Sequence, residues 1–429
     1  GGKVVLWSDV KNANSLTTAS GSIYAKGGVN GGDGGQVETS GHLLLVNGIH
    51  VNTVSATGNA GTWLLDPFHM VINSNGANFN STTTSGTTTY VSNDQSANSS
   101  SNSYIAASTI QTALASNNVM VQSSAGYDII SQGDGTIAYS GGTARTLTLN
   151  SGRNITLAYD SVTYPGGISG TNLSLVLQAT SGTVSNAAAI SVGGSVTVNS
   201  TGFSGSGAIS LGTNQALSIT QSGSSVYAGL ISGTGATLTK LGAGSLALTN
   251  ANTYSGGTTI NAGTIRAGNN AAIGTGTGTI ANGGALDLFG RTISNALSVA
   301  GQQTSSIGAL TDSSGNGIAS GAITLTANTS FGGAGAFTVS GVIDGAFNVT
   351  KVGAGTTTFS ATNTYSGTTT INTGTLQVGS GGATGTLGSG GVLNNAALIF
   401  NRNVTTDLSV ANAISGTGSV EQAGAGKTI

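Results

Sequence analysis

The side chains that could act as an acid, a base or a nucleophile are few and widely spaced. Two pairs of carboxylates lie close in sequence, Asp33 with Glu38 and Asp128 with Asp134. Hydrolysis of a glycosidic bond uses two carboxyl groups about 5–10 Å apart, so these pairs admit a carbohydrate-active enzyme as an interpretation. Such an enzyme would need carboxylates clustered on neighbouring turns of the fold, and the chain has 13 acidic residues in 429. We keep the enzyme as a minor alternative and expect no catalytic residue.

Three histidines, His42, His50 and His69, all lie in the first 72 residues. A catalytic triad needs a nucleophile, a histidine and an orienting acid in one constellation. No serine or aspartate is spaced around these histidines in a way that supports one. We expect the histidines and the four carboxylates to be solvated residues of turns and exposed faces.

Residues 27–35 read Gly-Gly-Val-Asn-Gly-Gly-Asp-Gly-Gly and look like one copy of a calcium-binding glycine–aspartate repeat. Such repeats hold Ca²⁺ because tandem copies share oxygen ligands between neighbouring turns. A single copy predicts a plain glycine-rich turn instead. We therefore expect no metal site and no other cofactor.

One stretch of sequence occurs twice without a gap, at 238–265 and at 349–376, and starts a third time at 414–429. The same offset separates Lys240 from Lys351 and Tyr254 from Tyr365. Internal repetition of this kind indicates an architecture in which each unit buries its apolar face on the next one.

The repeated lysines and tyrosines are the next candidates for a function. We predict that Lys240 and Lys351 extend solvated ammonium groups from turns. Tyr254 and Tyr365 are expected to be packed corner residues, with a binding site as the alternative. Asp66-Pro67 is expected to end a strand, because proline cannot donate a hydrogen bond to a sheet.

The composition excludes several classes of protein. Charged residues make up 6% of the chain, against about 25% in a typical soluble domain, and the net charge is -2. The 11 basic residues are scattered, so no nucleic-acid partner is expected. No run of residues is apolar enough for a transmembrane helix. Cysteine is absent, which excludes disulfides and thiolate metal sites.

Strand patterns dominate the chain. Short runs of alternating apolar and polar residues are bounded by Gly, Asn, Ser or Asp, which is typical of strands joined by tight turns. They include 3–7, 36–39, 146–149, 154–157, 173–177, 195–198, 216–219, 245–248 and 322–326. This spacing predicts an all-β, right-handed, rod-shaped parallel β-solenoid of about 18–20 coils, each of about 20–25 residues and stacked about 4.8 Å apart.

One segment interrupts the strands. Residues 108–115 have the apolar spacing of a short helix, with Ser108 or Thr109 as the N-cap. The Ser-, Thr- and Asn-rich residues 73–103 before it are predicted to form a loop or an excursion from the coils, with poor order. We therefore divide the chain into β-helix coils at 1–72, an excursion with the helix at 73–118, coils at 119–229, and repeat-bearing coils at 230–429 with a truncated third copy.

Ordered blocks at 1–9, 21–28, 31–41 and 61–67, among them Gly1-Gly-Lys-Val-Val-Leu-Trp-Ser-Asp9, resemble filamentous haemagglutinin-like exoproteins of two-partner secretion over residues 1–72. The repeats at 230–268, 341–379 and 414–429 resemble the autotransporter-associated β-strand repeat. Both resemblances imply right-handed β-helical passengers that are exported across a Gram-negative outer membrane.

The function expected from these observations is structural. We expect a stalk or adhesive passenger segment at the cell surface, with an outer-membrane transporter as its partner during export. Glycans and host or neighbouring-cell surfaces are the expected ligands, held by many weak contacts. The alternative is a self-associating extracellular filament or biofilm-matrix scaffold, because flat, uncharged solenoid faces are prone to pair.

Overall fold

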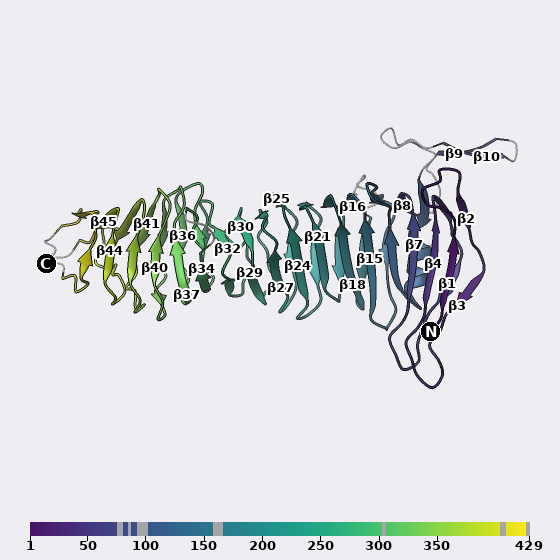
Figure 1. The fold of residues 1–429 in the computed structure, drawn as a ribbon, viewed down its shortest axis with the longest axis horizontal. Coiled ribbons are helices and arrows are strands. Elements are labelled where there is room, and N and C mark those ends of the chain that lie inside the picture. The colour runs from purple at the N-terminus through teal and green to yellow at the C-terminus, as the bar shows by residue number, and fades with distance from the viewer. Residues whose placement is uncertain are drawn as a thin grey trace. The chain divides into compact units, whose positions relative to one another are not determined.

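The computed structural model describes residues 1–74, 80–84, 87–91, 102–157, 166–302, 306–403 and 409–425. The described residues form an all-β parallel β-solenoid of about 16 turns with a single short helix (Figure 1). They divide into two compact units. Unit 1 comprises Gly1–Thr220 and Ala228–Gly233, and unit 2 comprises Gln221–Tyr227 and Thr234–Ile429.

Unit 1 contains three series of parallel strands. The first is β1 (Lys3–Trp7), β4 (Gln36–Gly41), β7 (Thr62–Pro67), β12 (Asn118–Gln122), β15 (Arg145–Ser151), β18 (Leu173–Ala179), β21 (Val196–Ser200) and β24 (Ala216–Gln221), whose last residue belongs to unit 2. The second is β8 (Met70–Asn73), β11 (Ser103–Ala106), β13 (Ile129–Ser131), β16 (Ile155–Leu157), β19 (Thr183–Asn186) and β22 (Gly202–Gly205). The third is β14 (Ile137–Ala138), β17 (Gly167–Gly170), β20 (Ala189–Val192), β23 (Ile209–Leu211) and β26 (Ile231–Ser232).

Two small parallel pairs accompany the first turns of unit 1. They are β2 (Leu16–Thr18) with β5 (Leu43–Leu45), and β3 (Ser22–Tyr24) with β6 (His50–Asn52). An antiparallel pair, β9 (Asn80–Thr84) with β10 (Thr87–Val91), lies within the segment predicted to be a loop or an excursion from the coils. The pair forms a two-stranded sheet of its own, which fits an excursion from the coils, and its threonine-rich runs favour strand over an irregular loop. Residues 75–79, 85–86 and 92–101 of the same segment lie outside the described residues.

Unit 2 repeats the three-sided plan. Its first series is β27 (Thr237–Leu241), β29 (Gly257–Ile260), β31 (Gly278–Ile280), β34 (Leu297–Gly301), β37 (Ile323–Phe331), β39 (Ile343–Asp344), β40 (Val349–Lys351), β42 (Thr369–Ile371), β44 (Val392–Asn394) and β46 (Ile414–Ser415). The second is β25 (Ser225–Tyr227), β28 (Ser245–Leu248), β30 (Gly263–Ala267), β32 (Gly284–Asp287) and β35 (Leu310–Thr311). The third is β33 (Thr292–Ile293), β36 (Gly317–Ala319), β38 (Phe337–Val339), β41 (Thr356–Phe359), β43 (Thr375–Val378), β45 (Ala397–Phe400) and β47 (Ser419–Gln422).

The strands predicted from alternation are confirmed, and the register explains why they stack. In unit 1 the inward position of one turn lies directly on that of the next, from Leu147 to Leu175 and from Leu175 to Val196. These three side chains are fully buried. More residues separate Leu147 from Leu175 than separate Leu175 from Val196, so the turns differ in length. Because some turns are longer than expected, the chain makes fewer of them than the sequence predicts.

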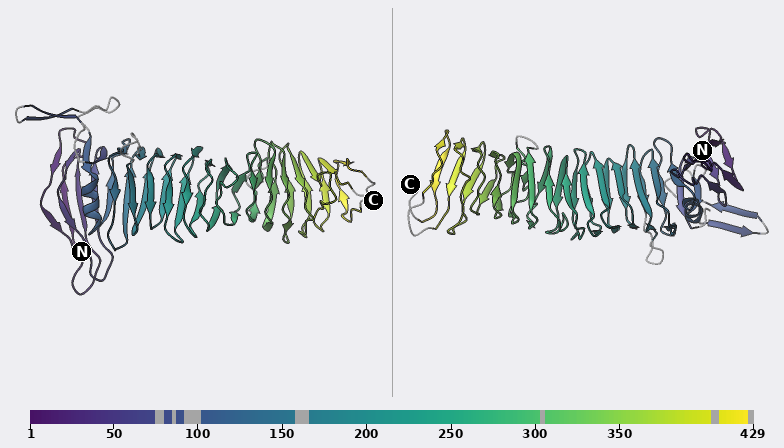
Figure 2. Two further views of the ribbon diagram at one scale, coloured as in Figure 1. Left: turned by 180° about the vertical axis from the view of Figure 1, so that it is seen from behind. Right: turned by 90° about the horizontal axis from the view of Figure 1, so that it is seen from below.

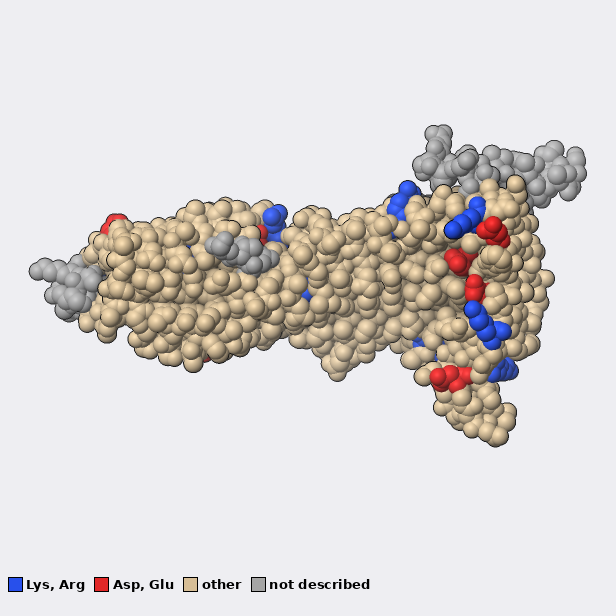
Figure 3. All heavy atoms as spheres, in the orientation of Figure 1, with Lys and Arg blue, Asp and Glu red and all other residues tan. Residues whose placement is uncertain are grey.

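The outward positions of successive turns carry stacked, uncharged polar side chains, which is consistent with the 6% content of charged residues. In unit 1, Gln122 pairs with Asn150, and Asn150 pairs with Gln178. Asn150 Nδ2 donates to Gln122 Oε1 at 3.0 Å, so the stacked amides bond to each other along the axis. On the face shown in Figure 3, charged side chains gather over the N-terminal turns of unit 1, and the turns of unit 2 carry few.

The predicted helix is confirmed as α1 (Ala107–Leu114), which is drawn as a coiled ribbon among the turns of unit 1 in Figure 2. It packs against β6, β12 and β14. The predicted serine or threonine N-cap is wrong, because the N-cap is Ala106 and no side chain caps it from within the helix. Asn47, from an earlier turn, replaces it. Its Oδ1 accepts hydrogen bonds from the backbone N–H of Ala106 at 3.0 Å and from the Thr109 hydroxyl at 3.4 Å. A long-range contact therefore holds the start of the helix.

No helix among the described residues is long and apolar enough to span a membrane.

Candidate functional site

The two repeats place a buried lysine at the end of a strand. Lys240, in β27, is 0% exposed, and Lys351, in β40, is 1% exposed. The prediction of solvated ammonium groups is therefore wrong. Lys351 stacks between Phe331 and Ile371 of the adjacent turns, so its side chain occupies a position of the apolar core ladder. The lysine stem supplies apolar packing there, and the ammonium group reaches the corner of the turn.

Each ammonium group meets three backbone carbonyls. Lys240 Nζ donates to the carbonyl oxygens of Leu241 at 2.7 Å, Gly242 at 2.8 Å and Ala262 at 3.5 Å. Lys351 Nζ lies 2.7, 2.8 and 3.2 Å from the carbonyl oxygens of Val352, Gly353 and Thr373. Since an ammonium group has three donors, the site is saturated. In each repeat, two acceptors belong to the lysine's own corner and the third to the next turn, so the lysine ties two turns together.

Glycine makes this corner possible. Gly353 has φ +72°, in the left-handed region that side chains with a Cβ rarely adopt. Gly374, on the next turn, has φ +69°, and a Cβ there would lie 2.8 Å from Lys351 Nζ. The glycines after each lysine thus turn the carbonyls towards the ammonium group and leave room for it.

Burial changes the acidity of both lysines. Desolvation lowers the pKa of Lys240 to about 8 and that of Lys351 to about 8, because an ammonium group loses hydration in the core. An amine of this acidity can act as a base or a nucleophile where a substrate can reach it. These two amines are enclosed, so the geometry supports a structural role.

The repeated tyrosines form a second corner, and the prediction of a packed corner residue is confirmed. Tyr254 and Tyr365 are both 0% exposed. Tyr254 Oη lies 2.6 Å from Thr258 Oγ1, and that hydroxyl donates to the carbonyl of Ile273 at 2.9 Å. Tyr365 Oη lies 2.7 Å from Thr369 Oγ1. Burial raises the pKa of both phenols, so they stay neutral and hydrogen-bonded at physiological pH.

Removal of one tyrosine hydroxyl tests this corner. We expect Tyr365→Phe to lower the free energy of unfolding by about 1 kcal/mol, because the Thr369 hydroxyl loses its buried partner while the ring keeps its packing. Urea unfolding followed by circular dichroism measures the change. Tyr24→Phe is the matched control, since Tyr24 is 62% exposed and should leave stability unchanged. Equal effects of the two variants would contradict a structural role for the Tyr365 hydroxyl.

The candidate carboxylates of unit 1 each bind a separate partner. Asp128 accepts two hydrogen bonds from the Arg153 guanidinium, at 2.7 and 2.6 Å. Burial favours a higher pKa for Asp128, but the hydrogen bonds from Arg153 and from Asn154 N–H outweigh it and lower the pKa. Asp134 accepts from the Ser74 hydroxyl. Because an acid catalyst in glycoside hydrolysis needs a raised pKa, Asp128 is poorly suited to that role.

The other predicted pair is also engaged. Glu38 Oε2 lies 3.5 Å from Lys3 Nζ, and its Oε1 accepts from the Ser40 hydroxyl at 2.9 Å. Asp33 Oδ1 accepts from the backbone N–H of Asn59 at 2.8 Å. Both carboxylates therefore hold neighbouring turns in place.

Two of the three histidines are buried, which corrects the prediction that all are solvated. His42 is 3% and His69 is 6% exposed, whereas His50 is exposed. His42 Nδ1 lies 2.9 Å from the carbonyl oxygen of Val10, and its ring stacks on Phe68 with 4.2 Å between centroids. His69 Nδ1 lies 2.6 Å from Asn102 Oδ1. Aromatic stacking and side-chain hydrogen bonding thus draw these rings inward.

The glycine-rich segment 27–35 turns as predicted. Gly31 N–H donates to the carbonyl of Gly28 at 3.2 Å, and Gly31 has φ +128°. Among the described residues, no three His, Asp or Glu side chains lie close enough together to hold a metal ion.

The prediction that Asp66-Pro67 ends a strand is confirmed, since β7 ends at Pro67. Burial raises the pKa of Asp66.

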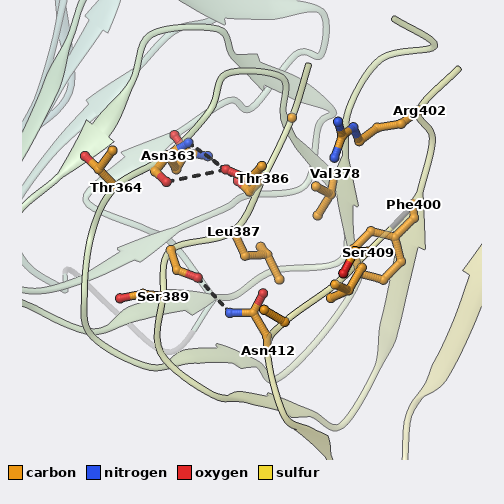
Figure 4. A pocket seen from close by; sticks show the side chains of 14 residues that line it. Asn363, Thr364, Val378, Thr386, Leu387, Ser389, Phe400, Arg402, Ser409 and Asn412 are labelled. Carbon is orange, nitrogen blue, oxygen red and sulfur yellow. Dashed lines mark hydrogen bonds between the residues drawn. The ribbon is translucent and has the colours of Figure 1, made fainter. Parts of the chain in front are cut away.

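A cavity of about 520 Å³ in unit 2 adjoins the second repeat (Figure 4). Its apolar wall includes Val378, Leu387 and Phe400. Two of its amide side chains bond to the protein: Asn363 Nδ2 donates to the carbonyl of Thr386 at 2.7 Å, and Asn412 Nδ2 donates to that of Gly388 at 2.7 Å. No acidic side chain is among its described lining residues. The described lining residues therefore supply no pair of carboxylates of the kind that glycoside hydrolysis uses.

Comparison with known proteins identifies the repeats. Residues 238–267 and 349–378 match the model of the passenger-associated-transport-repeat, and these segments contain the buried lysine and tyrosine of each copy. No curated protein and no solved structure gives a significant match to the chain. The two repeats and the parallel β-solenoid together fit an autotransporter passenger.

Proposed function

We propose that this chain is a stalk or adhesive passenger segment of a secreted exoprotein on the surface of a Gram-negative bacterium. The observation that carries the proposal is the presence of two passenger-associated-transport-repeats in a parallel β-solenoid. A solenoid held by regular ladders and saturated corners provides a stable spacer, because each turn is stabilised by its neighbours. The proposed partner during export is an outer-membrane transporter, and the proposed role is non-enzymatic.

The export route is a finer part of the proposal. The resemblance of residues 1–72 to filamentous haemagglutinin-like exoproteins supports two-partner secretion. The matched repeats support the autotransporter route. Both routes place the solenoid outside the outer membrane.

Protease accessibility on intact cells tests the proposal. We expect an antibody against unit 2 to label unpermeabilised cells of the producing bacterium, or to detect the protein in the medium. We also expect added proteinase K to remove the surface signal while a periplasmic control protein survives. A signal that appears only after permeabilisation would contradict surface exposure.

The second candidate is a self-associating filament or biofilm-matrix scaffold. The observation in its favour is exposed aromatic surface in unit 1, where Trp7 is 64% and Tyr24 is 62% exposed. Exposed apolar groups of this size favour association. Sedimentation and negative-stain microscopy over a concentration series distinguish the two candidates: discrete particles support a stalk, and fibres support a scaffold.

A further inference from the structure

Unit 2 has a second cavity of about 520 Å³, lined by consecutive turns. Ser245 of β28 pairs with Thr264 of β30, and Arg266 of β30 pairs with Asp287 of β32. Asp287 in turn pairs with Thr311 of β35, and all five side chains line the cavity. Because parallel turns stack about 4.8 Å apart, the cavity is a groove that follows the solenoid axis.

Arg266 is held in one orientation at this groove. Its Nε donates to Asp287 Oδ2 at 3.2 Å, and its Cζ lies 4.6 Å from the centroid of the Phe289 ring. The two Nη groups form no hydrogen bond with the described residues, and the side chain is 41% exposed. The guanidinium therefore presents two Nη groups that have no acceptor among the described residues.

Asp287 acts as the positioning residue. It is 3% exposed, and it accepts from the backbone N–H of Phe289 at 3.1 Å and from Ser313 N–H at 2.9 Å. The Ser313 hydroxyl adds a further bond to Asp287 at 2.7 Å. With these partners and Arg266, the carboxylate is saturated. The Asp287 carboxylate offsets part of the positive charge of Arg266, and because it binds Nε, the two Nη groups can donate to another acceptor.

The turn that carries Phe289 is strained. Phe289 has φ +46°, a conformation that a bulky side chain rarely adopts. Two buried aspartates hold it there, because Asp287 binds Phe289 N–H and Asp312 Oδ2 accepts from Gly290 N–H at 3.0 Å. Asp312 is fully buried. Backbone strain that several polar contacts maintain is typical of functional sites. Here the strained turn places the Phe289 ring against the Arg266 guanidinium.

We propose that this groove binds a carboxylate-bearing sugar, with Arg266 on the carboxylate. The two Nη groups match the two oxygens of a carboxylate in a bidentate pair. The hydroxyls of Ser245, Thr264 and Thr311 line the same groove and suit a polyhydroxylated ligand. Ile307, which is 39% exposed, offers an apolar surface for the C–H face of a pyranose ring. Because Asp287 already contributes a negative charge, a singly charged carboxylate fits better than a phosphate dianion.

Two kinds of glycan supply a carboxylate-bearing sugar: matrix polysaccharides, which contain uronic acids, and host glycans, which contain sialic acids. The inference deepens the proposed surface function and rests on the solenoid being outside the cell. Binding by purified protein does not depend on export, so the binding test and the protease test on intact cells can fail independently.

Isothermal titration of the whole purified chain tests the inference. The probes are a galacturonic acid tetramer with its methyl ester, and 3′-sialyllactose with lactose. We expect at least one acidic probe to bind and its neutral counterpart to bind about 10-fold more weakly or not at all, because a charge-assisted pair is lost. Binding of the galacturonate alone would assign a matrix polysaccharide, and binding of sialyllactose alone would assign a host glycan.

Variants locate the site. We expect Arg266→Gln to weaken binding of the acidic probe at least about 10-fold. Arg266→Lys should also weaken it, because an ammonium group cannot reproduce the two-donor geometry. Arg291→Gln is the matched control, since it removes the same charge from an exposed residue that does not line the groove. Melting curves confirm that the variants are folded. Absence of binding by both acids, equal binding of the neutral probes, or unchanged affinity in Arg266→Gln would overturn the proposal.

Discussion

Replacement of Lys351 by glutamate should destabilise unit 2 by at least about 4 kcal/mol, because a buried carboxylate would face three carbonyl oxygens that now accept from the ammonium group. We expect the loss to be local at first. Hydrogen exchange measured by mass spectrometry should show faster exchange in peptides covering 349–378, and urea unfolding should shift to a lower midpoint.

Two further variants separate charge reversal from loss of the lysine. Lys351→Met removes the donors and the buried charge together, so its loss of stability should be smaller than that of Lys351→Glu. Lys26→Glu is the matched control, because Lys26 is exposed in unit 1 and should tolerate reversal. If Lys351→Glu and Lys26→Glu had the same unfolding midpoint, the corner would not depend on the lysine.

The stability of unit 2 should rise with pH from about pH 8 to about pH 10. The pKa of each repeat lysine is about 8 in the folded state and 10.5 in the reference state. Between these values the unfolded chain binds more protons than the folded chain, so the free energy of unfolding increases with pH. The difference amounts to about 3 kcal/mol for each lysine over the full interval.

The tyrosines reverse the trend at higher pH. Burial raises the pKa of Tyr254 and Tyr365 above the reference value of 10.0. Above pH 10 the folded state therefore keeps protons that the unfolded state loses, and the free energy of unfolding falls. Urea unfolding at intervals from pH 7 to 11 should show a maximum near pH 10. The double variant Lys240→Met/Lys351→Met should lose the rise and keep the fall. A wild-type curve that declines steadily from pH 8 would contradict the lysine assignment.

Much of the fold follows from local pattern. Alternating runs such as 3–7 and 245–248 predicted strands with the observed bounds, because period-two alternation suits a strand with one buried face. The apolar spacing at 108–115 predicted α1 to within one residue.

The alternation of apolar and polar residues along a strand also contains a signal for the buried lysines. In Leu238-Thr239-Lys240 the lysine stands two residues after a core leucine and must point to the same side. The general preference of lysine for water obscured that signal.

The sequence by itself determined the parallel solenoid, its strands, its helix and its two repeats, because these depend on residue spacing within each turn. The tertiary structure decided which distant residues meet. Arg266, the pair Asp287 and Phe289, and Asp312 come from three successive turns, and Asn47 reaches α1 across the chain. Such contacts depend on the register between turns. Since the steps between stacked partners differ in length even within unit 1, no fixed period in the sequence could locate them.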